Sequence, residues 1–404
     1  TCGPQGTNIT VSTIEGTVLV FATGDFGFSD SADADNLANV IITTAPTNGI
    51  LYVDSNSNGL IDGGEGLNDL DTVSATDIAA GRLKFKPGAD ANGTGYDSFT
   101  FQVQDDGGTT NGGVDTDQTA NTMTIDVTAV NDAPVIGDLA GDTLNYAEGD
   151  GLVRIDQTLV GSLSVSDVDS ANFDTGTLTV SFLSGSDSAE DVLAIIHAGF
   201  GIGEIAVVGN TVRYEGGTIG TFTGGTGGSD LVVTLNSFAD DEATRALLLA
   251  IGYENTDTDN PTIGARTVRF VLTDGDGGTS ANNDTTVNVS RVNDTPGVVG
   301  PGSAYNVNEQ TNLNIHATGF SVTDVDAASG TITATFVVGE GTLTLTAGDS
   351  GVSIAANNAS TVSFSGTLAQ VNALITGAGS GTIVYNNGSD TPSPATTITL
   401  TVND

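Results

Sequence analysis

The chain has 404 residues, of which 50 are acidic and 9 are basic, so its formal net charge at pH 7 is −41. So few cations cannot neutralise the phosphates of a nucleic acid, and no apolar run reaches the roughly 18 residues that a membrane-spanning helix needs. One cysteine rules out a disulfide framework, whereas a hydrophobic fraction of 38% is enough to build packed cores.

The acidic residues are mostly aspartate, with 40 Asp against 10 Glu. Asp favours turns over helices, and its carboxylate is a hard oxygen ligand of the kind that calcium prefers. A chain with this much self-repulsion is also expected to gain stability from bound cations. Composition therefore favours calcium binding; the alternative is an acidic surface that only keeps a secreted protein soluble. The single cysteine, Cys2, fits an oxidising or extracellular compartment.

An alternation of apolar and polar residues dominates the chain and predicts half-buried antiparallel strands. It is clearest at residues 98–103, 123–127, 178–182, 268–272, 343–345 and 398–402. Helical signal is weak and is confined to residues 76–80, 189–198, 241–251 and 368–375. Turns of the Gly-Gly, Asn-Gly and Asp-Gly type separate the strands. We therefore predict an all-β protein of antiparallel β-sandwiches with short helical turns.

The same series of sequence features occurs three times. Each unit begins at a proline, continues with a lone glutamate and an Asp-x-Asp pair, and then has a Gly/Thr-rich middle and a short helical segment. The series is Pro4, Glu15 and Asp33/Asp35; then Pro134, Glu148 and Asp167/Asp169; then Pro296, Glu309 and Asp324/Asp326. These features predict three domains, at residues 1–132, 133–294 and 295–404, with a Gly/Thr-rich insert near 185–230 in the second.

The sharpest motif is a twelve-residue segment of the first domain, from Asp54 to Glu65. It matches the calcium loop of EF-hands, with oxygen ligands at positions 1, 3, 5 and 9, glycine at position 6 and glutamate at position 12. The predicted ligands are Asp54, Asn56, Asn58, the backbone carbonyl of Leu60, Asp62 and Glu65. A strand precedes the segment and no helix follows it, so we predict an EF-hand-like loop on a β-hairpin. The alternative is a polar Asn/Gly turn.

Two further motifs lie at the domain boundaries. Val-Asn-Asp occurs at residues 130–132 and 292–294, two residues before a proline, and again at 402–404. With the downstream Asp-x-Asp pairs, this pattern resembles the tandem cadherin-like or Ig-like repeats of large bacterial surface adhesins and exoproteins. The resemblance covers nearly the whole chain, although the linkers lack the longer Asp-x-Asn-Asp-Asn run of animal cadherins. The alternative is that the boundary residues form ordinary Asx turns.

The resemblance implies calcium sites in which a linker, an early glutamate of one domain and an Asp-x-Asp pair of the next converge. At the first linker these residues would be Glu15, Asn131, Asp132, Asp167 and Asp169. At the second linker they would be Glu148, Asn293, Asp294, Asp324 and Asp326. Two acidic turns at equivalent places, residues 105–108 and 274–278, are interpreted as hairpin turns, with weak calcium ligation as the alternative.

The third domain differs from the other two at its end. The spacing from Tyr385 aligns Asp404 with Asp105 and Asp274, so residues 398–402 match the penultimate strand of each earlier domain. We expect a sandwich that lacks its last strand and has an open edge. Either the chain continues beyond residue 404, or another copy donates a strand, for which residues 8–12 are the natural donor.

These features together predict a non-enzymatic extracellular protein in which calcium ions rigidify tandem sandwiches. Such a protein would serve as a cell-surface spacer, an adhesin or a matrix fibre. Its expected partners are calcium, cell-surface or matrix ligands and other copies of itself, with no nucleic acid and no membrane span. The alternative is an extracellular filament or surface-layer subunit that polymerises head to tail by strand donation.

Overall fold

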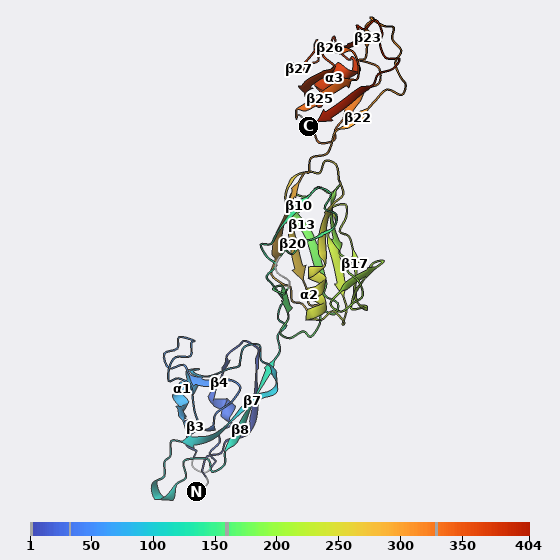
Figure 1. The fold of residues 1–404 in the computed structure, drawn as a ribbon. Coiled ribbons are helices and arrows are strands. Elements are labelled where there is room, and N and C mark those ends of the chain that lie inside the picture. Colours follow the sequence, from blue (N-terminus) through green and yellow to red (C-terminus); the bar gives the residue numbers. More distant parts are fainter. Residues whose placement is uncertain (1–2, 32–33, 158–160, 328–329) are drawn as a thin grey trace. The chain divides into compact units, whose positions relative to one another are not determined.

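The computed structural model describes residues 3–31, 34–157, 161–327 and 330–404 (Figure 1). Strands dominate and pair into several sheets, and the few helices are short. The protein is therefore all-β, as the alternation of apolar and polar residues predicts. Cys2 and Asp33 of the first Asp-x-Asp pair lie outside the described residues. None of the described helices is long and apolar enough to cross a membrane.

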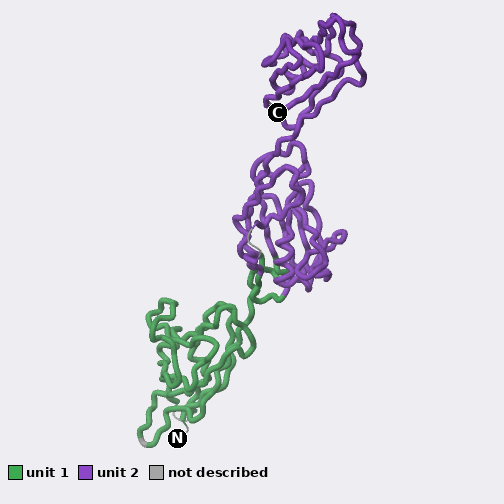
Figure 2. Tube along the Cα trace, viewed as in Figure 1, with its two compact units in different colours: residues 1–134, 166–171, 273–279 green, residues 135–165, 172–272, 280–404 purple. Residues whose placement is uncertain are grey.

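Two compact units divide the chain, and three separate hydrophobic clusters form its cores (Figure 2). The first unit comprises residues 1–134, 166–171 and 273–279, and the second comprises 135–165, 172–272 and 280–404. The buried clusters span residues 21–127, 136–289 and 315–400. We call the β-structures around them the first, second and third sandwich.

The first sandwich has a five-stranded sheet, β1-β8-β7-β3-β5, and a three-stranded sheet, β2-β6-β4. Its core takes Phe99, Phe101 and Val103 from β7, with the polar residues between them on the other face, because successive side chains of a strand alternate. The elements are β1 (Ile9–Ile14), β2 (Leu19–Val20), η1 (Thr23–Phe26), β3 (Leu37–Thr44), β4 (Ile50–Val53), β5 (Thr72–Ser74), α1 (Ala75–Ala79), β6 (Leu83–Lys86), β7 (Gly93–Asp105), η2 (Thr110–Gly112) and β8 (Asn121–Thr128).

The second sandwich is the largest, because a meander extends one of its sheets. Its sheets are β10-β21-β20-β13-β18-β17-β16-β15, β11-β19-β14 and β9-β12, and the strands β15 to β17 come from the Gly/Thr-rich segment. The elements are β9 (Val135–Gly137), β10 (Thr143–Ala147), β11 (Val153–Arg154), β12 (Ser164–Ser166), β13 (Thr177–Ser184), β14 (Asp191–Ile195), β15 (Ile205–Val208), β16 (Thr211–Tyr214), β17 (Gly217–Thr223), β18 (Leu231–Leu235), α2 (Asp241–Leu249), β19 (Ile251–Asn255), β20 (Gly264–Leu272) and β21 (Asn283–Ser290).

The third sandwich repeats this plan with fewer strands. Its sheets are β27-β28-β25-β30, β23-β29-β26 and β22-β24. The elements are β22 (Gly297–Val299), β23 (Leu313–Asn314), β24 (Ser321–Thr323), β25 (Ile332–Val338), β26 (Thr342–Thr346), β27 (Ser353–Ala356), β28 (Thr361–Gly366), α3 (Leu368–Thr376), β29 (Thr382–Asn386) and β30 (Ile398–Asn403).

Three of the four short helices expected from the sequence are present, and each begins at a side-chain cap. Ser74, Asp240 and Thr367 accept a hydrogen bond from the backbone N–H three residues further on. The helix expected at residues 189–198 is wrong, because this segment contains strand β14. Its alternate residues Asp191, Leu193 and Ile195 are buried against the core, so tertiary packing overrides a local preference for helix.

The strand pairing differs in one respect from an antiparallel expectation. β1 pairs with β8 in parallel, from Ile9 opposite Met123 to Ile14 opposite Thr128, and β10 pairs with β21 in the same way. The proposed donor segment, residues 8–12, therefore already has a partner in its own sandwich. Donation of this segment to another copy would break its pairing with β8.

Candidate calcium sites at the linkers

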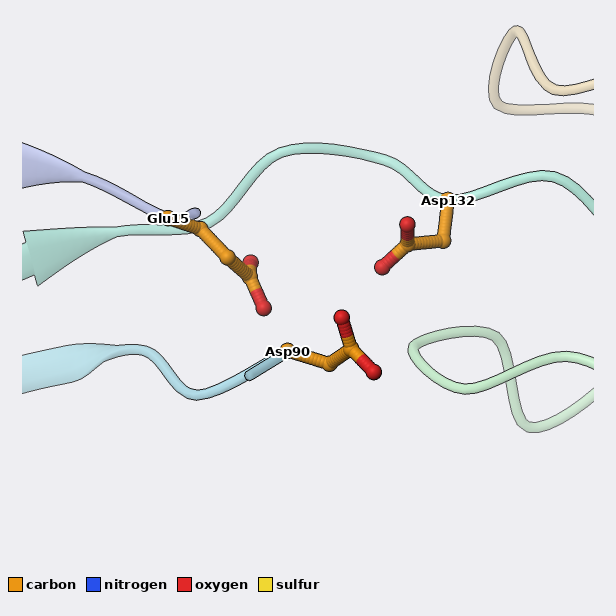
Figure 3. Close-up of side chains that lie close together, drawn as sticks. All are labelled: Glu15, Asp90 and Asp132. Atoms are coloured by element: carbon orange, nitrogen blue, oxygen red, sulfur yellow. The ribbon is translucent and has the colours of Figure 1, made fainter. Parts of the chain in front are cut away.

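A cluster of three carboxylates lies at the end of the first sandwich. Glu15 follows β1, Asp90 follows β6 and Asp132 belongs to the linker, and one oxygen of each lies within 4.8 Å of the others. Figure 3 shows the three carboxylates turned toward one another. We call them the first linker cluster. Glu15 and Asp132 are among the predicted ligands; Asp90 is not, because nothing in its local sequence distinguishes it from an ordinary turn residue.

The other predicted residues of the first linker lie in the same compact unit. The backbone N–H of Asp132 donates to Asp169 Oδ2 at 3.2 Å, and the Asn131 side-chain amide donates to Asp274 Oδ2 at 2.8 Å. Asp167 Oδ1 accepts the backbone N–H of Asp169 at 3.3 Å. The linker is thus hydrogen-bonded both to the Asp-x-Asp pair and to the acidic turn at residues 274–278. The sequence predicts only a hairpin turn for residues 274–278, with weak calcium ligation as the alternative.

Carboxylates repel one another at this linker. Burial, and then the neighbouring Asp169, raise the pKa of Asp167 to about 6. Burial also raises the pKa of Asp132, with further contributions from Asp90, Asp169 and Glu15. Groups that resist ionisation in this way are stabilised in their charged form by a nearby cation, so the electrostatics match a metal-binding function.

The second linker repeats these contacts at equivalent positions. The backbone N–H of Asp294 donates to Asp326 Oδ2 at 3.1 Å, and the Asn293 amide donates to Asp404 Oδ2 at 2.6 Å. Oxygens of Asp324, Asp326 and Asp404 lie within 4.8 Å of one another, and we call these residues the second linker cluster. The sequence spacing aligns Asp404 with Asp105 and Asp274, but it does not predict the contact between Asp404 and Asn293 of the linker.

Buried carboxylate oxygens without donors occur at both linkers: Asp167 Oδ2 at the first, and four oxygens at the second. Glu148, only 8% exposed, accepts the backbone N–H of Val292 at 3.0 Å through Oε2. Its Oε1 has no hydrogen-bond partner among the described residues, and the same holds for one oxygen each of Asp294, Asp324 and Asp326. Native proteins rarely leave buried polar atoms unpaired, so these oxygens fit the coordination of a hard cation such as calcium.

The twelve-residue segment from Asp54 to Glu65 has a different character, because its carboxylates already have donors. Asp54, 1% exposed, accepts the backbone N–H groups of Asn58 and Gly59, each at 3.0 Å, and Lys84 Nζ at 2.7 Å. The hydrogen bond from Lys84 is the main reason why the pKa of Asp54 is lowered. Lys84 therefore supplies a positive charge beside the first predicted ligand, a contact that no local sequence pattern predicts.

The remaining predicted ligands of this segment hydrogen-bond to one another. Asp62 Oδ2 accepts the amides of Asn56 at 2.7 Å and Asn58 at 2.9 Å. Glu65 Oε1 accepts the backbone N–H of Ser55 at 2.9 Å. Leu60, the predicted carbonyl ligand, is 64% exposed. Calcium binding here requires the two amides to turn their oxygens inward and Lys84 to leave Asp54.

A third acidic cluster lies in the first sandwich, away from the predicted ligand sets. Oxygens of Asp30, Asp35 and Asp105 lie within 4.8 Å of one another. Asp35 belongs to the first Asp-x-Asp pair, and Asp105 occupies the position that Asp274 and Asp404 hold in the other two domains. Both residues stand at positions that recur in the repeats, so the repeat pattern contains the signal for this cluster, although the pattern alone does not show that Asp30 joins them.

Solved structures that are similar to this chain include cadherin ectodomains. No family model matches the chain, and no curated protein does. Mouse Cadherin-23 EC22-24 is 13% identical over 91% of this chain and 89% of its own, with a TM-score of 0.33. The Protocadherin gammaB7 EC3-6 cis-dimer is 13% identical over 100% of this chain and 74% of its own, with a TM-score of 0.33. Protocadherin Gamma B7 domains 1-4 are 12% identical over 90% and 68%, with a TM-score of 0.30. At these values the likeness carries no argument about function.

Proposed function

We propose that this chain is a non-enzymatic, extracellular calcium-binding protein whose tandem sandwiches are held together at their linkers by bound calcium. The observation that carries this proposal is the set of buried carboxylate oxygens without donors at the second linker, with Glu148 Oε1 foremost. Calcium would satisfy these oxygens and neutralise their mutual repulsion. Glu148 and the second linker cluster are the proposed ligands, together with Asn293 and Asp294.

The first linker would bind calcium in the same way, through the first linker cluster, Asp167 and Asp169, with Asn131 orienting Asp274. Without calcium, a linker rich in unpaired carboxylates is flexible, because like charges repel. With calcium, the linker would become stiff enough for a cell-surface spacer, an adhesin or a matrix fibre. Tandem cadherin-like repeats of bacterial adhesins and exoproteins are the kind of protein that this function fits.

The segment from Asp54 to Glu65 is a further proposed calcium site, of lower affinity than the linkers. Its ligands would be those predicted from the sequence, with Lys84 as a competitor for Asp54. A cation that must displace an ammonium at 2.7 Å binds more weakly than one that fills unpaired oxygens. This difference in affinity makes the two kinds of site separable in a titration.

Isothermal titration calorimetry, in which CaCl₂ is added to the calcium-free chain, tests the proposal by measuring the number and affinity of the calcium sites. Glu148→Gln removes a charged ligand and is expected to weaken binding at the second linker by about tenfold or more, a free-energy change of about 1.4 kcal/mol. The matched control is Glu309→Gln, because Glu309 holds the equivalent place in the third domain but its side chain is exposed, whereas Glu148 is buried with one unpaired oxygen. Equal titration curves for the two variants would contradict the proposal.

Adhesion is tested separately from calcium binding. Beads coated with the chain are expected to aggregate in calcium and to disperse when EDTA is added, if the protein binds other copies of itself. Beads that stay dispersed in calcium, combined with a positive titration, would leave the spacer function as the one supported.

A further inference from the structure

Positive charge is concentrated on one strand of the first sandwich. Arg82 precedes β6, and Lys84 and Lys86 lie within it, so three of the nine basic residues of the chain fall within residues 82–86. Leu83 and Phe85 of the same strand are fully buried, which places Lys84 and Lys86 together on the outer face of the sheet β2-β6-β4. A cationic face of this kind is able to bind an anion if one of its cations lacks a partner.

The three cations differ in their partners. Arg82 donates to Asp77 Oδ1 at 2.9 Å, and Lys84 Nζ donates to Asp54 Oδ2 at 2.7 Å. Lys86 is exposed and forms no ion pair with any described residue. In a chain with 50 acidic residues, the ammonium of Lys86 therefore remains available to a negative charge from outside.

A pocket of about 450 Å³ is lined by Lys86, a volume within the range of about 300–1,000 Å³ that small-molecule sites have. Its apolar surface comes from Ile50, Ile61, Pro87 and Ala89, and the described residues that line it include no Asp or Glu. Ile50 lies opposite Lys86 in the pairing of β4 with β6 and is 47% exposed. Since residues opposite each other in an antiparallel pair share a face, apolar surface lies directly beside the ammonium.

Two turns form walls of this pocket, and internal hydrogen bonds hold both in place. The backbone N–H groups of Asn48 and Gly49 donate to Asp97 Oδ2 at 2.8 and 2.9 Å. The Tyr96 hydroxyl donates to the carbonyl of Asn48 at 2.7 Å and accepts the backbone N–H of Gly88 at 3.1 Å. Because these polar groups already have partners, the pocket offers a ligand mainly the ammonium of Lys86 and a preformed apolar surface.

We propose that this pocket binds a carboxylate attached to an aliphatic group, with the carboxylate at Lys86 Nζ and the aliphatic group against Ile50 and Ile61. The lining has no aromatic side chain on which a sugar ring could stack, so an aliphatic acid fits it better than an acidic sugar. The net charge of −41 does not prevent binding, because salt at 0.1 M screens exposed charges that are more than about 10 Å apart. The local lining therefore decides which ligand is accepted.

Saturation-transfer difference NMR on the full chain tests the proposal, with N-acetyl-L-leucine as the probe in a buffer free of calcium and of other carboxylates. We expect saturable binding with a Kd of about 1–10 mM, the weak range that one partly exposed charge pair and a small apolar contact allow. N-acetyl-L-leucinamide has nearly the same shape without the charge and is expected to bind about fivefold more weakly. No saturation up to about 50 mM, or equal binding of the acid and the amide, would overturn the proposal.

Exposed positions allow the site to be located without disturbing the fold. Lys86→Met keeps the aliphatic stem and removes the charge, so it should weaken binding about fivefold, whereas Lys86→Arg should restore it. Ile50→Glu puts a carboxylate into the pocket and should weaken binding at least about fivefold. The matched control is Val20→Glu, since Val20 is 50% exposed on the same sheet but does not line the pocket. Unchanged binding in Lys86→Met, or equal losses in the two glutamate variants, would refute the location.

An aliphatic carboxylate can come from a small free acid or from the carboxyl end of a polypeptide. The same NMR titration with isocaproate and with the tripeptide acetyl-Gly-Gly-Leu distinguishes these sources. Tighter binding of the tripeptide would assign the pocket to a polypeptide terminus, and a tripeptide that binds no tighter than isocaproate would assign it to a small acid; either result supports the proposal. Lys86 and Ile50 belong to none of the proposed calcium sites, so failure here leaves the proposed function unaffected.

Discussion

Arg266 provides a sharp test of how the second sandwich is stabilised. Its side chain is fully buried on β20 and donates to Asp191 Oδ2 at 3.1 Å, to Glu190 Oε1 at 3.5 Å and to the carbonyl of Gly264 at 2.9 Å. It also donates to the carbonyl of Thr262. Asp191 is 1% exposed. Arg266→Met therefore leaves a buried carboxylate without its counter-charge.

Removing one partner of a buried ion pair costs about 3–5 kcal/mol. In the Arg266→Met variant, Asp191 keeps hydrogen bonds from the Tyr253 hydroxyl and the Asn255 amide. We therefore expect a loss in the free energy of unfolding at the lower end of this range, about 3 kcal/mol. For a domain of this size, about 2–4 °C of melting temperature is lost per kcal/mol. The second sandwich should therefore melt about 6–12 °C lower, while the other transitions stay in place.

Arg269→Met is the matched control, because Arg269 lies three residues further along the same strand in a partly exposed pair. It donates to Asp284 Oδ1 at 2.7 Å, with the two side chains 29% and 39% exposed, so water screens the pair and its loss should cost far less than the loss of the buried pair. Differential scanning calorimetry at neutral pH compares the two variants. Adding Asp191→Asn to Arg266→Met should recover part of the loss. Equal shifts for the two arginine variants would refute the reasoning.

Three further predictions concern calcium and pH. Chelation with EDTA should lower the melting temperature, because a site held at about 100 times its Kd contributes about 2.7 kcal/mol; identical melting curves with and without calcium would contradict this. Glu65→Gln should remove one site from the calcium titration and leave the linker sites intact, and an unchanged stoichiometry would identify the segment as a turn. Arg269 lowers the pKa of Asp284, so this pair stabilises the fold above about pH 4 and loses its contribution as the pH falls through the lowered folded value. Asp284→Asn should make acid unfolding, followed by circular dichroism, slightly less dependent on pH; an unchanged profile would show that the pair contributes nothing measurable.

Local patterns were sufficient for most of the strands and for three helices. Alternating residues such as Phe99, Phe101 and Val103 identify a strand because only a period of two places them all on one face. Caps such as Ser74 and Thr367 mark helix starts because their side chains satisfy backbone donors that the helix leaves free. The helix predicted at residues 189–198 is wrong because local patterns do not show strand pairing. This segment pairs with β19, about 60 positions further along the chain.

The candidate ligands were predictable where a repeat spaced them regularly. Glu15 and Glu148 stand out because a lone glutamate follows each domain start, and the Asp-x-Asp pairs recur at similar distances. Asp90 was not predictable, since it reaches the first linker cluster through the path of β6 alone. Lys84 was missed for a related reason: its contact with Asp54 depends on the pairing of β4 with β6.

The sequence by itself determined the all-β class, the threefold repeat and the acidic character of the linkers, because these depend on composition and on spacing along the chain. Only the tertiary structure decided which carboxylate oxygens are buried without donors, that β1 pairs in parallel with β8 and β10 with β21, and that Lys84 contacts Asp54. Burial and strand neighbours are properties of residues brought together from distant parts of the chain. A pattern along the sequence carries no information on what finally lies opposite each side chain.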